Sequence, residues 1–208
     1  MKLADEAIAG AIMFVGASQF VLCMIVAESL YPSYSISDNY ISDLGVGPSS
    51  LIFNSSVFLL GLAAVISVYF LRSLISDYKA FQFSLMLCGV GAMGVGVFPE
   101  NFGFIHTIFS LFAFLFGALS AIASFKIQKP PLSHISIILG VLSIAALLLF
   151  AFSEYCAYIY RQAFSLDYLG LGKGGLERLI AYPIILWAMG FSGHLIGESK
   201  AYYSTMNP

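Results

Sequence analysis

The chain has 208 residues, of which 60% are hydrophobic and only 10% are charged, and its mean hydropathy is +0.92. Soluble domains carry roughly 25% charged residues, so this composition excludes an ordinary water-soluble globular protein, and lipid must be the solvent for much of the surface. The formal net charge of -2, without a clustered basic face, argues against a nucleic-acid partner.

Six apolar segments follow in chain order, and each is close to the roughly 20 residues that a helix needs to cross the hydrocarbon layer. The sequence therefore predicts an all-α protein, in which residues 1–208 form a single transmembrane domain built as a helix bundle. The first segment is too long for the apolar core of a signal peptide, so we expect it to be retained. Glycines cluster in the third segment, which favours close packing between helices. The predicted spans are 8–28, 51–71, 81–98, 104–125, 135–152 and 176–196.

Basic residues are distributed unevenly among the chain ends and the links between the segments. Six lie at the two ends and in the second and fourth links, three lie in the fifth link, and the first and third links have none. Because cytoplasmic loops are enriched in Lys and Arg, this pattern favours a multi-pass protein of the cell membrane with both termini in the cytoplasm. The six are Lys2, Arg72, Lys79, Lys126, Lys129 and Lys200, and the fifth link carries Arg161, Lys173 and Arg178.

The richest polar stretch, at 35–45, lies between the first and second segments. It reads SISDNYISDLG and contains two aspartates but no Lys or Arg. Two further polar stretches fall on the same predicted side of the membrane: 98–106 leads into the fourth segment, and 174–183 leads into the sixth. We expect the three stretches to converge on the outer face of the bundle, with Asn54 about one turn inside the second helix.

These stretches could form a polar pocket that opens to the outer leaflet. Asp43, His106 and Glu177 are candidates for an acid and a base, or for ligands of a divalent metal. Ser42 is a candidate nucleophile if His106 reaches it. The candidate binding residues for a polar head group are Asn39, Asn54, Glu100, Asn101, Arg178 and Tyr182.

The same residues also have a purely structural interpretation, which we favour over catalysis. Asp and Asn can cap helix starts, Arg178 can pair with a carboxylate, and Tyr side chains and Trp187 can anchor helices at the membrane interface. At the other end of the bundle His134, His194 and Glu198 could hold a metal, although polar residues at helix ends more often face water.

The polar stretches resemble a known family. The runs at 39–45, 98–106 and 177–183 are similar to the prokaryotic membrane proteins grouped as domain of unknown function 998, and this resemblance covers nearly the whole chain. More distantly, the Tyr-Ile-Ser-Asp tetrad at 40–43, followed by His106 at the start of the fourth segment, is similar to the Frag1/DRAM/Sfk1 family, although Leu44 stands where that family usually has Thr. Members of that eukaryotic family are linked to lipid remodelling of GPI anchors, lipid asymmetry and autophagy, so this resemblance implies a lipid-related role.

Three functional hypotheses follow from the sequence, and membrane lipids are the expected partners. The first is a non-enzymatic protein that binds or senses a lipid head group in the outer pocket. The second is an intramembrane hydrolase or lipid-modifying enzyme that uses Asp43, His106 and Glu177. The third, a small transporter, ranks last because the sequence has no obvious inverted repeat and few charges within the predicted spans.

Overall fold

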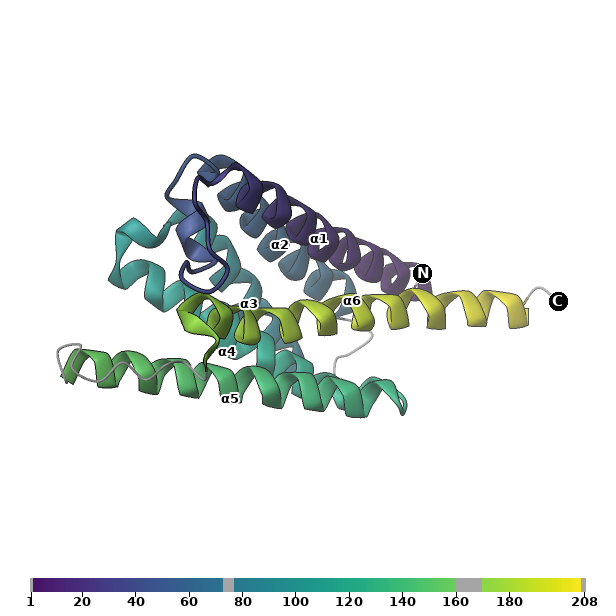
Figure 1. The fold of residues 1–208 in the computed structure, drawn as a ribbon. Coiled ribbons are helices and arrows are strands. Elements are labelled where there is room, and N and C mark those ends of the chain that lie inside the picture. The colour runs from purple at the N-terminus through teal and green to yellow at the C-terminus, as the bar shows by residue number, and fades with distance from the viewer. Residues whose placement is uncertain (1, 73–76, 160–169, 207–208) are drawn as a thin grey trace.

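The structure is a computed structural model, and it describes residues 2–72, 77–159 and 170–206 (Figure 1). Six helices in this part of the chain are long and apolar enough to cross a membrane, which confirms the predicted all-α bundle. Three short 3-10 helices lie in the links. The long helices are α1 (Lys2–Leu30), α2 (Ser50–Leu71), α3 (Lys79–Val97), α4 (Phe104–Ala123), α5 (Leu132–Ile159) and α6 (Gly172–Met206), and the short ones are η1 (Ser42–Gly45), η2 (Glu100–Phe102) and η3 (Ser124–Lys126).

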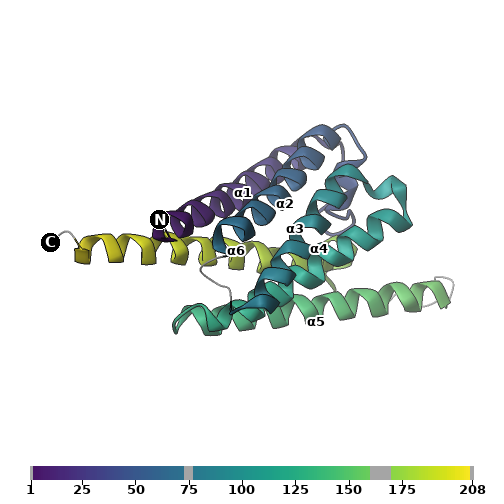
Figure 2. The same cartoon turned by 180° about the vertical axis from the view of Figure 1, so that it is seen from behind.

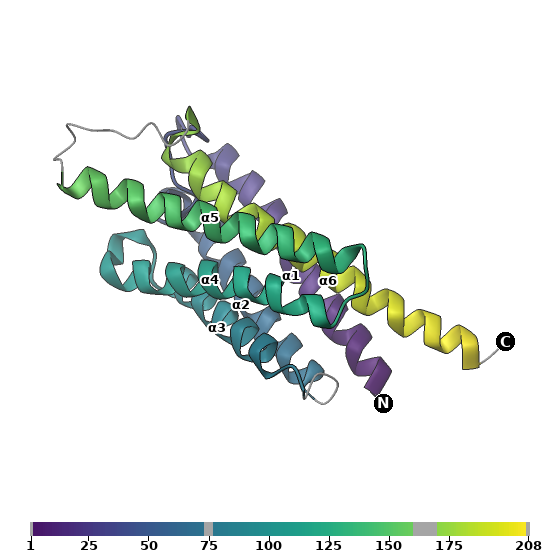
Figure 3. The ribbon, with the colours of Figure 1, turned by 90° about the horizontal axis from the view of Figure 1, so that it is seen from below.

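Helices that follow each other in the chain pack side by side, and α6 also packs against α1, so that these contacts join the six helices into a ring. Figure 3 shows α5 running alongside α4 and α6. The two chain ends lie at one end of this ring, whereas the links at 31–49 and 98–103 lie at the other (Figures 1 and 2). We call this second end the capped end. It is the end at which the sequence predicted the polar stretches to meet.

Several helices extend beyond their apolar segments. The fifth was expected at 135–152 but runs from Leu132 to Ile159, and the sixth was expected at 176–196 but runs from Gly172 to Met206. The added turns include polar side chains such as Glu154. Hydropathy marks the part of a helix that lipid can accept, so it does not locate the helix ends.

Glycines bring α2, α3 and α4 close together, as the glycine-rich third segment predicted. A Cβ atom on Gly61 would lie 2.4 Å from the carbonyl oxygen of Gly89 in α3, and one on Gly91 would lie 2.4 Å from the backbone nitrogen of Ala113 in α4. Only a residue without a Cβ atom allows these backbones to approach so closely. The three helices therefore form a tightly packed side of the ring.

Trp187 lies in the core, so its predicted position at the membrane interface was wrong. Its side chain is 2% exposed and stacks on Phe191, with Phe81 packed edge-on against it. Its Nε1–H donates a hydrogen bond to the hydroxyl of Ser124 at 2.9 Å. A tryptophan whose indole N–H has a partner inside the protein can be buried without the wet surroundings of the interface.

Candidate functional site

The segment 31–41 lies across the start of α6 and is held there through backbone groups. The N–H of Gly174 donates to the carbonyl oxygen of Ser37 at 2.9 Å, and the N–H of Ile41 donates to Oε2 of Glu177. Gly174 has no room for a side chain, because a Cβ atom there would lie 1.9 Å from the carbonyl oxygen of Asn39. The first link therefore docks onto a helix start that is 136 residues away along the chain.

Arg178 is a buried side chain that connects α6 to α1 and to the first link. Its side chain is 6% exposed, and Nη2 donates to Oε1 of Glu28 and to the hydroxyl of Tyr34, both at 2.7 Å. Nη1 donates to the carbonyl oxygens of Ile36 at 3.1 Å and Gly174 at 3.0 Å. The expectation that Arg178 pairs with a carboxylate is confirmed. Since both Nη groups are engaged within the protein, little of this charge faces a ligand.

Asp43 closes a turn in the first link. Its Oδ2 accepts hydrogen bonds from Nδ2 of Asn39 at 2.8 Å and from the N–H of Tyr40 at 3.0 Å. The helices η1, α2 and α4 each begin without a side-chain cap bond, so the capping role expected of Asp and Asn was wrong for these three starts. Asp and Asn side chains stabilise turns by the same kind of bond to the backbone that caps a helix. Here the side chain of Asp43 makes that bond within a turn and not at a helix start.

The first and third links meet at Glu100. The hydroxyl of Ser42 lies 3.5 Å from Oε2 of Glu100, and η1 packs against η2. Burial raises the pKa of Glu100 to about 7, a hydrogen bond and charge repulsion from Asp43 add to this rise, and the charge of Lys173 opposes it. Glu100 therefore changes its charge near neutral pH. The predicted convergence of the three polar stretches is confirmed by these contacts and by the docking of segment 31–41 on α6.

His106, near the start of α4, is 8% exposed and uses both ring nitrogens. Its Nδ1 lies 2.9 Å from the carbonyl oxygen of Phe98, and its Nε2 lies 3.1 Å from the hydroxyl of Ser110. Within the described residues, His106 makes no hydrogen bond to Ser42 or to the carboxylates of the proposed site. Sequence reasoning missed Ser110, although a spacing of four residues places it on the same helix face as His106.

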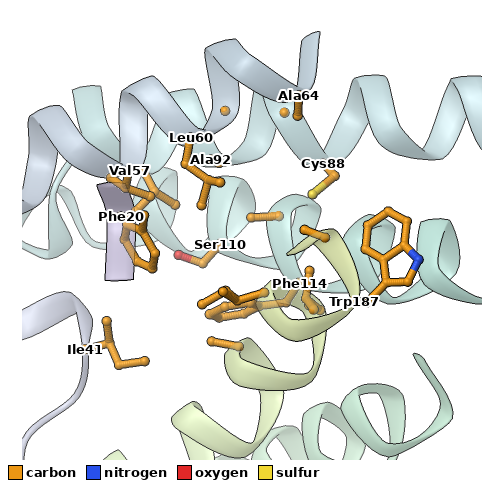
Figure 4. A pocket seen from close by; sticks show the side chains of 18 of the residues that line it. Phe20, Ile41, Val57, Leu60, Ala64, Cys88, Ala92, Ser110, Phe114 and Trp187 are labelled. Atoms are coloured by element: carbon orange, nitrogen blue, oxygen red, sulfur yellow. The ribbon is translucent and has the colours of Figure 1, made fainter. Parts of the chain in front are cut away.

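A cavity of about 110 Å³ lies inside the ring and is bounded by α1, α2, α3, α4, α6 and η1 (Figure 4). We call it the chamber. Its walls are mainly apolar, and Figure 4 shows the hydroxyl of Ser110 among side chains that include Phe20, Ala92 and Phe114. In the described part of the chain, the oxygen-bearing side chains that line it are Ser42, Ser110 and Glu177. Two of the sequence-predicted site residues, Ser42 and Glu177, thus reach this space.

Other predicted binding residues lie around the capped end. Asn54 donates from Nδ2 to the carbonyl oxygen of Gly45 at 2.9 Å, which ties α2 to η1. Asn101 is exposed in η2, and Tyr182 is 38% exposed on α6. Arg161, which the sequence placed near this face, lies outside the described residues.

The residues considered for a metal at the opposite end do not form a cluster in the described part of the chain. Glu198 forms an ion pair with Lys129 at 3.2 Å, and His134 is exposed at the start of α5. Across residues 2–72, 77–159 and 170–206, no group of three or more His, Cys, Asp or Glu side chains is placed to hold a metal ion. The divalent metal considered from the sequence therefore has no ligand cluster in this part of the chain.

A family model described as "Protein of unknown function (DUF998)" matches residues 14–194. The chain belongs to this family. In this DUF998 protein the matched region includes Ser42, His106, Ser110 and Glu177, and it reaches from α1 into α6. No curated protein and no solved structure matches the chain. The more distant resemblance to the Frag1/DRAM/Sfk1 family stays a prediction.

Proposed function

We propose that this DUF998 protein binds an amphipathic lipid, with a short apolar portion in the chamber and the head group beside Ser42 and Glu177. One observation carries the proposal: the chamber has apolar walls, and two of its three oxygen-bearing side chains come from η1 and the start of α6. An apolar pocket with a few convergent polar groups is typical of small-molecule sites. A lipid matches this division between an apolar and a polar part.

The size of the chamber limits what can enter it. Its volume of about 110 Å³ is somewhat smaller than an engineered apolar cavity of about 150 Å³ that holds one benzene molecule. A short stretch of an acyl or isoprenoid chain, or a single ring, fits this space. The rest of the lipid would lie between the helices or in the surrounding bilayer.

The charges at the capped end select the head group. Asp43, Glu100 and Glu177 supply carboxyl groups there, and the charge of Arg178 is already paired with Glu28. Among the described residues, Oε1 of Glu177 has no hydrogen-bond donor. A head group with hydroxyl or amine donors would complement these acceptors, whereas a phosphate placed directly beside them would be repelled.

The distribution of basic residues supports an orientation in which the chain ends are cytoplasmic and the capped end faces outward from a cell membrane. The lipid would then be taken from the outer leaflet. The carboxyl groups at the capped end would meet the head-group layer, because side chains at helix starts lie near the membrane surface.

Filling the chamber tests this function. Ala92 lines the chamber and is 6% exposed, so Ala92→Leu should displace the apolar portion of the ligand. Ala145→Leu adds the same atoms at an exposed position of α5 and serves as the control. Mass spectrometry of lipids retained after purification in mild detergent should show a retained lipid class in the wild type and the control, and its loss in Ala92→Leu. Equal retention in all three proteins would contradict the proposal.

A further inference from the structure

Ser110 and His106 form a hydrogen-bonded pair whose direction is fixed by the backbone. A carbonyl oxygen can only accept, so the 2.9 Å contact with Phe98 requires that Nδ1 of His106 carry the proton. In the neutral imidazole Nε2 then has a lone pair, and it accepts the hydrogen bond from the hydroxyl of Ser110 at 3.1 Å. This is the arrangement in which a histidine removes a proton from a serine, with the other ring nitrogen held by an orienting acceptor.

Other serines of the spanning helices make a different bond. Ser120 of the same helix donates to the carbonyl oxygen of Phe116 at 2.7 Å, and Ser192 of α6 donates to the carbonyl oxygen of Ala188 at 2.5 Å. A serine hydroxyl within a helix is usually hydrogen-bonded in this way, to a carbonyl oxygen of the preceding turn. Ser110 instead pairs with an imidazole side chain and lines the chamber.

We propose that Ser110 is a nucleophile, activated by His106, that cleaves an acyl ester of the lipid bound in the chamber. This inference rests on the proposed lipid binding and adds a reaction to it. The sequence considered Ser42 for this role, but the hydroxyl of Ser42 lies next to Glu100 and the imidazole faces Ser110. The substrate class is an oxygen ester whose acyl carbon lies beside Ser110 and whose alcohol portion lies toward Glu177.

The reaction balances with water as the co-reactant. The Ser110 oxygen forms a bond to the acyl carbon while its proton passes to Nε2 of His106. The ester C–O bond then breaks, and the leaving alcohol takes the proton from Nε2. Water, deprotonated by the same Nε2, attacks the acyl-serine, and the acid is released as the Ser110 hydroxyl is restored. During both steps Nδ1–H stays on the carbonyl oxygen of Phe98, which keeps the ring oriented.

An alkyl fluorophosphonate, which reacts covalently with activated serines, tests the proposal on the full-length protein in detergent. Peptide mass spectrometry should place the adduct on Ser110, and hydrolysis of p-nitrophenyl octanoate should accompany it. Ser110→Ala should abolish both, and His106→Gln should slow both by about a hundredfold or more, because a general base contributes at least that factor. Ser120→Ala removes a hydroxyl from the same helix and should leave both rates unchanged.

Lipid retention, measured on the same samples, separates the two proposals. A retained lipid without an adduct at Ser110 and without ester hydrolysis would overturn the nucleophile and leave the binding function standing. An adduct confined to another serine would also overturn it. If the wild-type protein neither retains a lipid nor is labelled at Ser110, both proposals are contradicted. Because the adduct is mapped on the wild-type protein, the result does not depend on the folding of any variant.

Discussion

The guanidinium of Arg178 lies 2.7 Å from the carboxylate of Glu28, which ties the start of α6 to the last turn of α1. The same guanidinium reaches Tyr34 and the carbonyl oxygen of Ile36 in the first link. One side chain thus joins two helices and the segment that covers them.

Arg178→Ala should lower the free energy of unfolding by about 3 kcal/mol, because it leaves Glu28 without its partner in a largely buried setting. Unfolding in mixtures of mild detergent and SDS measures the change. Lys129→Ala, which breaks the exposed ion pair with Glu198, is the matched control and should cost less than about 1 kcal/mol. Similar losses in the two variants would contradict a structural role for Arg178.

Glu100 should make stability depend on pH. Its pKa is raised from 4.5 to about 7, so between these pH values the folded protein holds a proton that the unfolded chain has released. The stability contributed by protonated Glu100 is therefore complete below about pH 4.5 and is lost as the pH rises through about 7. In the described part of the chain, Asp43, Ser42 and Lys173 interact with it, and its charge also acts on Glu177.

Glu100→Gln stays neutral and should remove this slope. Between acid and mildly alkaline pH its stability should rise relative to wild type by about 1 kcal/mol, which is well below the full linkage value because the side chain is only half-buried. Unfolding curves recorded across that pH range measure the difference. Parallel pH profiles for the two proteins would show that the pKa of Glu100 is the same in the folded and unfolded states, which would contradict the raised pKa.

Gly174→Ala should disturb the docking of the first link. The added Cβ atom would overlap the carbonyl oxygen of Asn39, and we expect a loss of about 1–3 kcal/mol. Gly193→Ala makes the same change in the same helix where no atom lies within 4 Å, so it should be neutral or slightly stabilising. Thermal unfolding in detergent compares the two. A smaller loss at Gly174 than at Gly193 would contradict the observed packing.

Glu177→Gln should change the choice of head group more than the total uptake of lipid. The amide can still accept the hydrogen bond from Ile41, but it no longer offers a charged acceptor. Binding of an ethanolamine-bearing lipid should weaken about tenfold, because a charged hydrogen bond contributes at least about 1.5 kcal/mol. A diacylglycerol, which has only a hydroxyl, should be affected less. Competition between the two lipids, followed by native mass spectrometry, measures this preference.

The helices and their convergence could be predicted from the sequence. Apolar runs of spanning length predict where the chain crosses lipid. Because each crossing reverses the direction of the chain, the first and third links lie at the same end of the bundle. That alternation of crossings predicts their common end, but it does not predict that Ser42 meets Glu100 rather than His106. The same reasoning places the first link and the start of α6 at one end, whereas the bonds of Gly174 and Glu177 that dock segment 31–41 there were not predicted.

The roles of individual side chains could not be predicted in the same way. Arg178 was expected to bind a ligand or pair with a carboxylate, and its partner Glu28 lies 150 residues away, so only the folded chain selects between the two. Ser110 lies in an apolar helix, where a serine is usually satisfied by the preceding turn. A spacing of four residues places it near His106, but the direction of their hydrogen bond depends on the carbonyl oxygen of Phe98, which only the folded chain brings to Nδ1.

The contact between Ile41 and Glu177 has a consequence for how long a guest molecule stays. Ile41 forms part of the chamber wall, and its N–H is held by the same carboxylate that faces the interior. Ile41 uses Oε2, so a head group bound at Oε1, as we propose, would share the carboxylate with the wall segment, and occupancy and closure of the wall would support each other. A substitution that loosens segment 31–41 would then weaken retention of the guest even where it touches no part of the guest.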